Sequence, residues 1–285
     1  MTKLAIISDL HIDLNQFSDF EKETLLTILQ ETGVTHLHLT GDISNHHKDI
    51  SLPFIEELRK SLEVTYNLGN HDMLDLNDSE INQLDFQVYN LGSRQLLAFH
   101  GWYDYSFSRE PTDKILRLKK TFWFDRRLNR QESDPAITQK VLARLEDLLQ
   151  HLDTSRLIVA MHFVPHQDFT MTHPKFAPFN AFLGSQKFHQ IFVNYGVRDV
   201  VFGHAHRSYG DQTIEGVTYH SHPLGYIREW DLTIDFVSNH PELNPSGTWN
   251  LSKRYNLVRK NPDYQAYKKE QFQTELLKSM TIFGC

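Results

Sequence analysis

The sequence predicts a layered α/β fold, and three observations lead to this prediction. Strand-like apolar runs alternate with amphipathic helical patterns over the first 75 residues. Further apolar runs follow helical patterns later in the chain, and two pairs of short strands are spaced like hairpins. Such an alternation builds a parallel sheet through right-handed crossovers, with helices packed against the sheet.

The expected elements follow one another in chain order. Five apolar runs are interpreted as strands, at 4–7, 36–39, 64–68, 157–161 and 200–202. The spacing of apolar residues predicts helices from 18 to about 33, at 53–62, from 134 to about 152, at 185–195 and at 262–280. Alternation and turn residues predict hairpins at 86–99 and 212–221 and a further strand at 231–237.

We expect the whole chain, 1–285, to form a single domain with one irregular insertion. Residues 103–134 show no clear period and are rich in aromatic and basic side chains. A long segment of this kind is usually functional, and its aromatic content argues against disorder. Two interpretations stay open: a cap whose rings and arginines meet the substrate, or a satellite of the core. The helix at 262–280 is expected to pack on the domain or on a second subunit.

The composition restricts the possible function classes. The chain has 285 residues, 40% hydrophobic content and a formal net charge of -7. Because non-specific nucleic-acid binding needs a basic face, this charge argues against an extended nucleic acid as partner. The single cysteine, Cys285, excludes a disulfide within the chain and fits a reducing compartment. Neither a signal peptide nor an apolar run of roughly 20 residues is found, so we expect a cytoplasmic protein without a membrane partner.

Potential metal ligands follow all five apolar runs. They occur in the motifs Asp9-Leu10-His11, Gly41-Asp42, Gly69-Asn70-His71-Asp72, the single His162, and Gly203-His204-Ala205-His206. In an open α/β sheet, functional residues collect beyond the carboxyl ends of the strands, so these side chains should converge. Carboxylates, an amide and imidazoles together suit metal ions that activate water and neutralise the charge of a phosphate ester. The pattern therefore predicts a metal-dependent hydrolase.

In the order and spacing of these motifs, which extend over residues 5–206, the chain resembles the calcineurin-like metallophosphoesterase superfamily. The resemblance implies a four-layer αββα sandwich with two mixed β-sheets face to face. It also implies two metal ions, the first held by Asp9, His11 and His206, the second by Asn70, His162 and His204, with Asp42 bridging both. A hydroxide between the metals would attack phosphorus, and His71 would act at the leaving oxygen as general acid or charge-stabilising donor.

One departure from the family pattern concerns the residue that would orient His71. Some members carry a second aspartate three residues after the Gly-Asp motif, whereas Asn45 occupies that position here. An amide oxygen can accept a hydrogen bond from an imidazole but cannot compensate a positive charge, so His71 should be less biased toward its protonated form. This argues against the protein serine/threonine phosphatase branch. Asp72 is expected to cap a helix.

Most of the 17 histidines carry no functional signal. His36 and His38 lie inside a predicted strand and are expected to be packed or hydrogen-bonded. His46 and His47 are expected to be exposed. His222, in the loop after the second hairpin, is a candidate substrate-binding residue because of its position alone.

The leading hypothesis is a dinuclear metal-dependent phosphoesterase that hydrolyses a phosphate mono- or diester. Mixed oxygen and nitrogen ligands suit manganese, iron or zinc, as divalent or trivalent ions. The acidic balance favours a small phosphorylated substrate, with nucleotides included. The alternative is a non-catalytic metal-binding scaffold or interaction module on the same fold. The sequence does not decide the oligomeric state.

Overall fold

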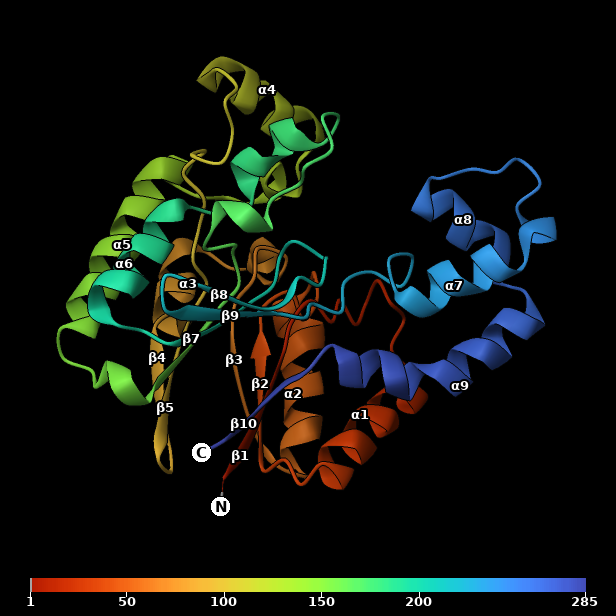
Figure 1. The fold of residues 1–285 in the computed structure, drawn as a ribbon, viewed down its shortest axis with the longest axis horizontal. Coiled ribbons are helices and arrows are strands. Elements are labelled where there is room, and N and C mark those ends of the chain that lie inside the picture. The colour runs from red at the N-terminus through yellow and green to blue at the C-terminus, as the bar shows by residue number, and fades with distance from the viewer. Residues whose placement is uncertain (1) are drawn as a thin grey trace.

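The computed structural model describes residues 2–285 and contains two β-sheets between layers of helices (Figure 1). The first sheet has the order β10-β1-β2-β3, comprising β1 (Lys3–Ile7), β2 (His36–Thr40), β3 (Glu63–Asn67) and β10 (Thr281–Gly284). The second has the order β4-β5-β6-β7-β9-β8, comprising β4 (Gln87–Leu91), β5 (Arg94–Phe99), β6 (Leu157–Met161), β7 (Asp199–Phe202), β8 (Gly210–Ile214) and β9 (Val217–Ser221). Both sheets are mixed, because β10, β4 and β8 run antiparallel to their neighbours.

The α-helices flank the two sheets. They are α1 (Asp19–Glu31), α2 (Leu52–Arg59), α3 (Asp78–Leu84), α4 (Thr112–Phe122), α5 (Asp134–Leu149), α6 (Gln186–Tyr195), α7 (Asp231–Asn239), α8 (Leu251–Val258) and α9 (Pro262–Lys278). In Figure 1, α5 and α6 lie on the left beside the second sheet, α1, α7, α8 and α9 lie on the right, and α4 projects at the top. No helix within residues 2–285 has both the length and the hydropathy that a membrane span requires.

The alternation of side chains along β1 shows how the layers pack. Leu4 and Ile6 belong to an apolar cluster between the two sheets. Ala5 and Ile7 belong to another cluster, which the first sheet shares with α1, α2, α7 and α9. Because successive side chains of a strand point to opposite faces, each sheet packs on the other sheet with one face and under helices with the other. The predicted four-layer αββα sandwich is confirmed.

One predicted strand is wrong, because residues 231–237 form the first part of α7. Leu232 and Phe236 lie four residues apart and are both buried, as expected for one face of a helix. Glu275 of α9 accepts hydrogen bonds from the backbone N–H groups of Asp231 and Leu232, at 2.8 and 3.1 Å. A carboxylate on the free N–H groups of a first turn stabilises a helix, and no local sequence pattern reveals this contact.

The insertion at 103–134 is more regular than its sequence indicates. It contains α4 and a 3-10 turn at Phe124–Arg127. Tyr103, at its start, is fully buried and stacks on Trp102 with ring centroids 4.9 Å apart. The end of α4 and the 3-10 turn instead line the cavity described below. The insertion therefore begins in the core, reaches the candidate site at Phe122, Trp123 and Phe124, and returns to Trp102 through the buried Asp134.

Candidate metal centre

The side chains that follow the strands converge beyond the carboxyl ends of both sheets, as the sequence predicts. The first donor group consists of Asp9, His11, Asp42 and His206. The second donor group consists of Asp42, His162 and His204. Within each group, one ligand atom from every residue lies within 4.8 Å of the others. Asp42 belongs to both groups, so one carboxylate lies between two clusters of donors.

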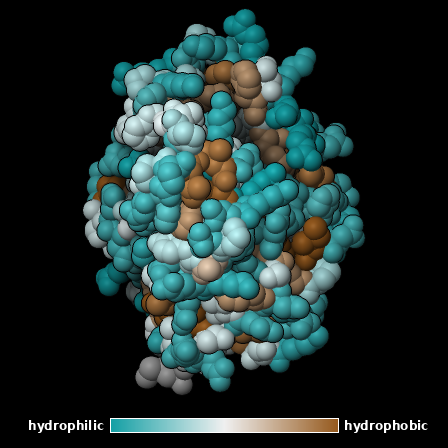
Figure 2. All heavy atoms as spheres, turned by 90° about the vertical axis from the view of Figure 1, so that its right-hand side faces the viewer, coloured by the Kyte–Doolittle hydropathy of each residue, from teal (hydrophilic) through white to brown (hydrophobic). Residues whose placement is uncertain are grey.

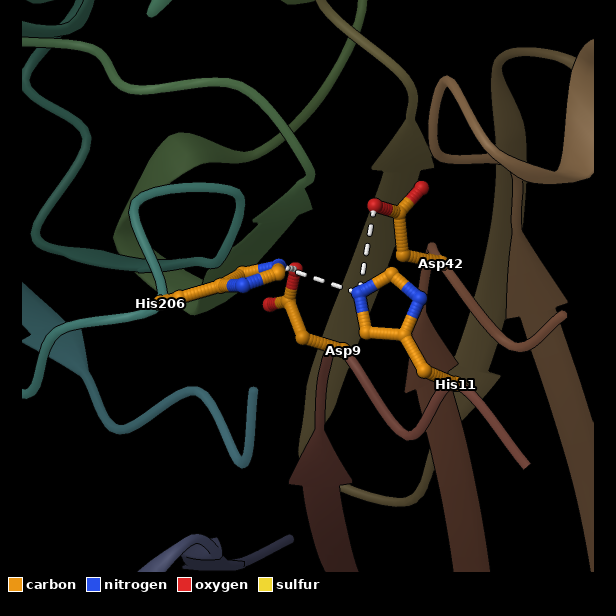
Figure 3. Close-up of side chains that lie close together, drawn as sticks. All are labelled: Asp9, His11, Asp42 and His206. Carbon is orange, nitrogen blue, oxygen red and sulfur yellow. Dashed lines mark hydrogen bonds and ion pairs between the residues drawn. The ribbon is translucent and has the colours of Figure 1, made fainter. Parts of the chain in front are cut away.

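Figure 3 shows the side chains of the first donor group pointing toward one another. The Nε2 atoms of His11 and His206 are 3.0 Å apart. Nε2 of His11 lies 3.6 Å from Oδ2 of Asp42, and Nε2 of His206 lies 3.2 Å from Oδ1 of Asp9. Two imidazole nitrogens cannot face each other at this distance with free lone pairs, so a proton or a cation must lie between them. The donor set fits a metal ion.

The second donor group has the same character. Nε2 of His162 lies 3.4 Å from Oδ1 of Asp42 and 3.2 Å from Nδ1 of His204. The amide oxygen of Asn70, which follows β3, is 3.2 Å from the same Nε2 atom. Two imidazoles, a carboxylate and an amide oxygen therefore face one point, and this donor set also fits a metal ion.

The buried carboxylates of the two donor groups are stabilised by positive charge on neighbouring groups. Asp9 and Asp42 are almost completely buried. Burial lowers the pKa of His162, but the Asp42 carboxylate outweighs it and raises the pKa to about 9. Burial likewise opposes protonation of His206, yet hydrogen bonds to Asp9 and Glu229 raise its pKa to about 10. Protons on the two imidazoles thus supply charge that bound metal ions would supply instead.

The backbone of the site is strained. Five of the nine non-glycine residues with positive φ among residues 2–285 are candidate ligands: Asp9 (58°), His11 (42°), Asp42 (52°), His204 (67°) and His206 (49°). Such conformations cost about 1–3 kcal/mol each and persist where the surrounding structure enforces them, most often at functional sites. This concentration of strain supports a function for the two donor groups.

Two glycines let the backbone approach the buried carboxylates. A Cβ atom on Gly69 would lie 2.2 Å from Oδ1 of Asp42. A Cβ atom on Gly203 would lie 2.2 Å from Oδ2 of Asp9. Both distances are far below van der Waals contact, so the glycines of these two motifs are required by packing around the carboxylates.

His71 lies beside the donor groups and is held on three sides. Its Nδ1 is 2.8 Å from Oδ1 of Asn45, and its Nε2 is 3.3 Å from the Tyr226 hydroxyl. The ring of Phe124 stacks on it, with centroids 3.7 Å apart and an interplanar angle of 14°. Burial lowers the pKa of His71 to about 4, and the charge of Asp42 opposes this only in part. The predicted contact with Asn45 is confirmed.

Two carboxylates that support the donors have no signal in the sequence. Oδ1 of Asp125, in the 3-10 turn after α4, accepts a hydrogen bond from Nδ2 of Asn70 at 2.7 Å, which turns the amide oxygen toward His162. Oε2 of Glu229 lies 3.0 Å from Nδ1 of His206. Partners of this kind orient metal ligands, but Asp125 and Asn70 are 55 residues apart, and no motif connects them.

Asp72 does not cap a helix, contrary to the sequence prediction. Its Oδ1 accepts hydrogen bonds from the backbone N–H groups of Ile43 and Ser44, and its Oδ2 accepts one from Gly69, at distances from 2.8 to 3.2 Å. Asp72 therefore joins the loop after β2 to the loop after β3. It fixes the two loops that carry Asp42 and Asn70.

The other histidines lie outside the donor groups. His36 and His38 are hydrogen-bonded to residues of β3, as predicted. His46 is exposed, but the prediction is wrong for His47, which is 2% exposed and packs near Tyr66. Nε2 of His222 lies 2.9 Å from Oδ1 of Asp211, and His222 does not line the cavity beside the donor groups.

A cavity of about 480 Å³ opens beside both donor groups. Asp42, Asn70, His71, His204 and His206 contribute to its base. The rest of its lining consists of Phe122, Trp123, Phe124, Met171, Phe176, Phe179, Leu183, Ala205, Tyr226, Arg228 and Glu229. A ligand in this cavity would contact the candidate metal ligands and His71 together.

Comparison with models of known protein families gives a match. The model of the calcineurin-like phosphoesterase family matches residues 2–208, which include every motif discussed above. The chain belongs to the calcineurin-like phosphoesterase family. Members of this family depend on metals, and both donor groups lie within the matched residues. Comparison with curated protein sequences gives no match.

Comparison with solved structures gives further matches, and the first of those described here shares the fold. Phosphopantetheinyl hydrolase from Mycobacterium tuberculosis is 20% identical, with a TM-score of 0.65 over 80% of this chain and 91% of that one. A dimetal phosphatase from Danio rerio is 14% identical, with a TM-score of 0.48 over 77% of this chain and 86% of that one. Purple acid phosphatase from yellow lupin is 13% identical, with a TM-score of 0.48 over 77% of this chain and 43% of that one.

Proposed function

We propose that this protein is a dinuclear metal-dependent phosphoesterase that hydrolyses a phosphate mono- or diester. The observation that carries the proposal is the convergence of two donor groups that share the carboxylate of Asp42. Membership of the calcineurin-like phosphoesterase family supports the reaction class. The strained backbone of the candidate ligands supports a site built for function and not only for stability.

The ligand roles follow from the donor groups. One ion would be held by Asp9, His11 and His206, the other by Asn70, His162 and His204, and Asp42 would bind both. Such ions, when bound, supply an activated water and positive charge for the phosphoryl oxygens. The mixed oxygen and nitrogen donors suit manganese, iron or zinc. The single cysteine of the chain supports a reducing, cytoplasmic compartment.

His71 would serve the leaving group. Oδ1 of Asn45 accepts a hydrogen bond from Nδ1–H, which fixes the ring so that Nε2 faces Tyr226 and the cavity. Donation from Nε2 requires a second proton on the ring, and the negative charge of a bound phosphoryl group would favour its uptake. His71 would then pass this proton to the leaving oxygen of the ester or stabilise the charge of that oxygen through a hydrogen bond. The stacked ring of Phe124 excludes water from one face of the imidazole.

The test is hydrolysis of phosphate esters by the purified protein supplied with manganese, iron or zinc. Bis(p-nitrophenyl) phosphate and p-nitrophenyl phosphate report diesterase and monoesterase activity, and a phosphopantetheinyl ester is included because a structurally similar enzyme carries that name. Asp42→Asn is expected to lower kcat by about 10² or more, because both ions would lose a shared ligand. The matched control is Asp147→Asn, at an exposed position of α5.

Two outcomes would contradict the proposal. Full activity of Asp42→Asn would exclude a reaction that depends on the shared carboxylate. Absence of hydrolysis with every ester and metal, in a protein that still binds metal, would favour the non-catalytic scaffold.

A further inference from the structure

We infer that the substrate is an ester of a single phosphoryl group with an alcohol that carries an aromatic ring or a similar planar apolar group. This inference rests on the proposed function, because the donor groups would fix the phosphoryl end. It adds the chemical class of the remainder of the substrate.

One side of the cavity is an aromatic wall, formed by Phe122, Trp123, Phe124, Phe176 and Phe179. The wall comes from two segments, the end of α4 with its 3-10 turn and the 3-10 helix at Ala177–Phe182 with the residue before it. Phe122 is 66% exposed and Phe176 is 47% exposed. Exposed apolar side chains that gather in one patch, as these rings do, often mark a binding site, whereas single exposed ones do not.

The aromatic wall is continuous with the donor groups. Phe124 stacks on His71, and the indole of Trp123 meets the ring of His204 with centroids 6.1 Å apart. From there the wall continues outward, because Trp123 stacks on Phe179 with centroids 6.1 Å apart and an interplanar angle of 25°. A planar group attached to a phosphoryl oxygen at the metal centre would therefore lie against rings along its length.

The anchoring of Trp123 fixes the inner part of the wall. Its indole N–H donates a hydrogen bond to Oδ2 of Asp125 at 3.0 Å. The other oxygen of the same carboxylate holds Asn70 of the metal centre. Asp125 therefore holds both Trp123, which a substrate would contact, and Asn70, a proposed metal ligand. Because Trp123 is already fixed, substrate binding would cost little side-chain entropy at this position.

The charge of the lining does not favour substrates with several phosphates. Among the described residues around the cavity, Arg228 is the one arginine or lysine. Its guanidinium lies 3.9 Å from the Tyr226 ring centroid and 3.4 Å from Oε1 of Glu229, so its charge is already partly compensated. Polyphosphates and nucleic acids are bound by several cationic side chains. The part of the cavity away from the donor groups is lined by aromatic rings and not by several cationic side chains.

The upper part of the molecule, where Figure 1 places α4, shows the same character on its surface. Figure 2 shows apolar side chains gathered in the upper half of one face, among mainly hydrophilic surroundings. Part of this apolar surface lies at the height of α4, whose last residue, Phe122, lines the cavity.

The test compares propyl phosphate with 3-phenylpropyl phosphate, each as the monoester and as the methyl diester. Both leaving groups are primary alkoxides, so their reactivity is closely matched and the pair differs in the ring. The ring-bearing ester is expected to have a kcat/KM about tenfold higher or more, because the ring would be buried against several others. ATP is expected to be hydrolysed with a lower kcat/KM than 3-phenylpropyl phosphate.

Variants locate the effect. Phe176→Ala and Phe122→Ala alter half-exposed or exposed rings and are expected to lower the ratio of the two kcat/KM values toward one. Trp249→Ala is the matched control, because Trp249 is 89% exposed and does not line the cavity, and it should leave the ratio unchanged. Equal kcat/KM values for the two esters, or a preference for ATP, would overturn the inference and leave the proposed function intact. Hydrolysis of p-nitrophenyl esters without hydrolysis of 3-phenylpropyl phosphate or its methyl diester would also overturn the inference alone, whereas failure to hydrolyse any ester with any metal would contradict the proposed function and the inference with it.

Discussion

Replacement of Asp125 by alanine is expected to weaken metal binding although Asp125 is not a proposed ligand. The carboxylate is 2% exposed and accepts hydrogen bonds from Asn70 at 2.7 Å and from Trp123 at 3.0 Å. Without it, the amide of Asn70 is free to turn, and its oxygen loses the orientation toward His162. Loss of a group that orients a metal ligand typically lowers metal affinity by about 10–100-fold.

The effect of the same change on stability is expected to be small, because two contributions oppose each other. Alanine leaves two donors without a partner, which costs about 1–3 kcal/mol each. Burial raises the pKa of Asp125 from 3.8 to about 6. At neutral pH the burial of the charged carboxylate therefore destabilises the metal-free protein, and alanine removes this cost. Metal affinity, and not the free energy of unfolding, is the sensitive readout.

The assay is isothermal titration of the metal-free protein with manganese, together with urea unfolding. Asp125→Asn is expected to lie between wild type and Asp125→Ala, because an amide oxygen can still accept from Asn70. Asp147→Ala, on the surface of α5, is the control. If Asp125→Ala bound both ions with wild-type affinity, the role assigned to Asp125 would be refuted. A loss of stability without a loss of affinity would show a purely structural contribution.

Two further predictions concern histidines with different roles. His71→Ala should lower kcat by about 10²–10⁴ for alkyl phosphate esters and less for p-nitrophenyl esters, whose leaving group needs no proton; equal losses in steady-state assays would exclude a role at the leaving oxygen. Burial lowers the pKa of His220, but hydrogen bonds to Asp199 and Asp211 outweigh it and raise the pKa above 6.5. A raised pKa means that His220 contributes stability that is fully present below pH 6.5 and is lost as the pH rises through the folded-state pKa. The free energy of unfolding, measured with urea, should therefore be higher for wild type than for His220→Gln by a larger margin near pH 5.5 than near pH 9. A difference that does not change with pH would refute this prediction.

The metal donors could be predicted from the sequence because geometry fixes where they lie. The carboxyl ends of parallel strands meet at one edge of a sheet, so residues directly after strands converge whatever the loops do. Asp9, Asp42 and His162 each lie within two residues of the end of a strand. The two-sheet arrangement came from the family resemblance, since strand periodicity does not show which strands share a sheet.

The features that the sequence analysis missed depend on contacts between segments that are distant in the chain. Glu275 stabilises the first turn of the helix at 231–237 from a position 44 residues after Asp231. Asp125 reaches Asn70 from an irregular segment, and packing beside Tyr66 buries His47. None of these partners shares a periodic pattern with the residue it affects, so propensity and spacing could not reveal them.

The most direct test of the account is the number and position of metal ions in crystals of the protein grown with manganese. Anomalous scattering is expected to show two ions per chain on either side of the Asp42 carboxylate, and no more than one ion in Asp42→Asn. A single ion in the wild-type protein, or two ions at full occupancy in Asp42→Asn, would contradict a centre built around one shared carboxylate.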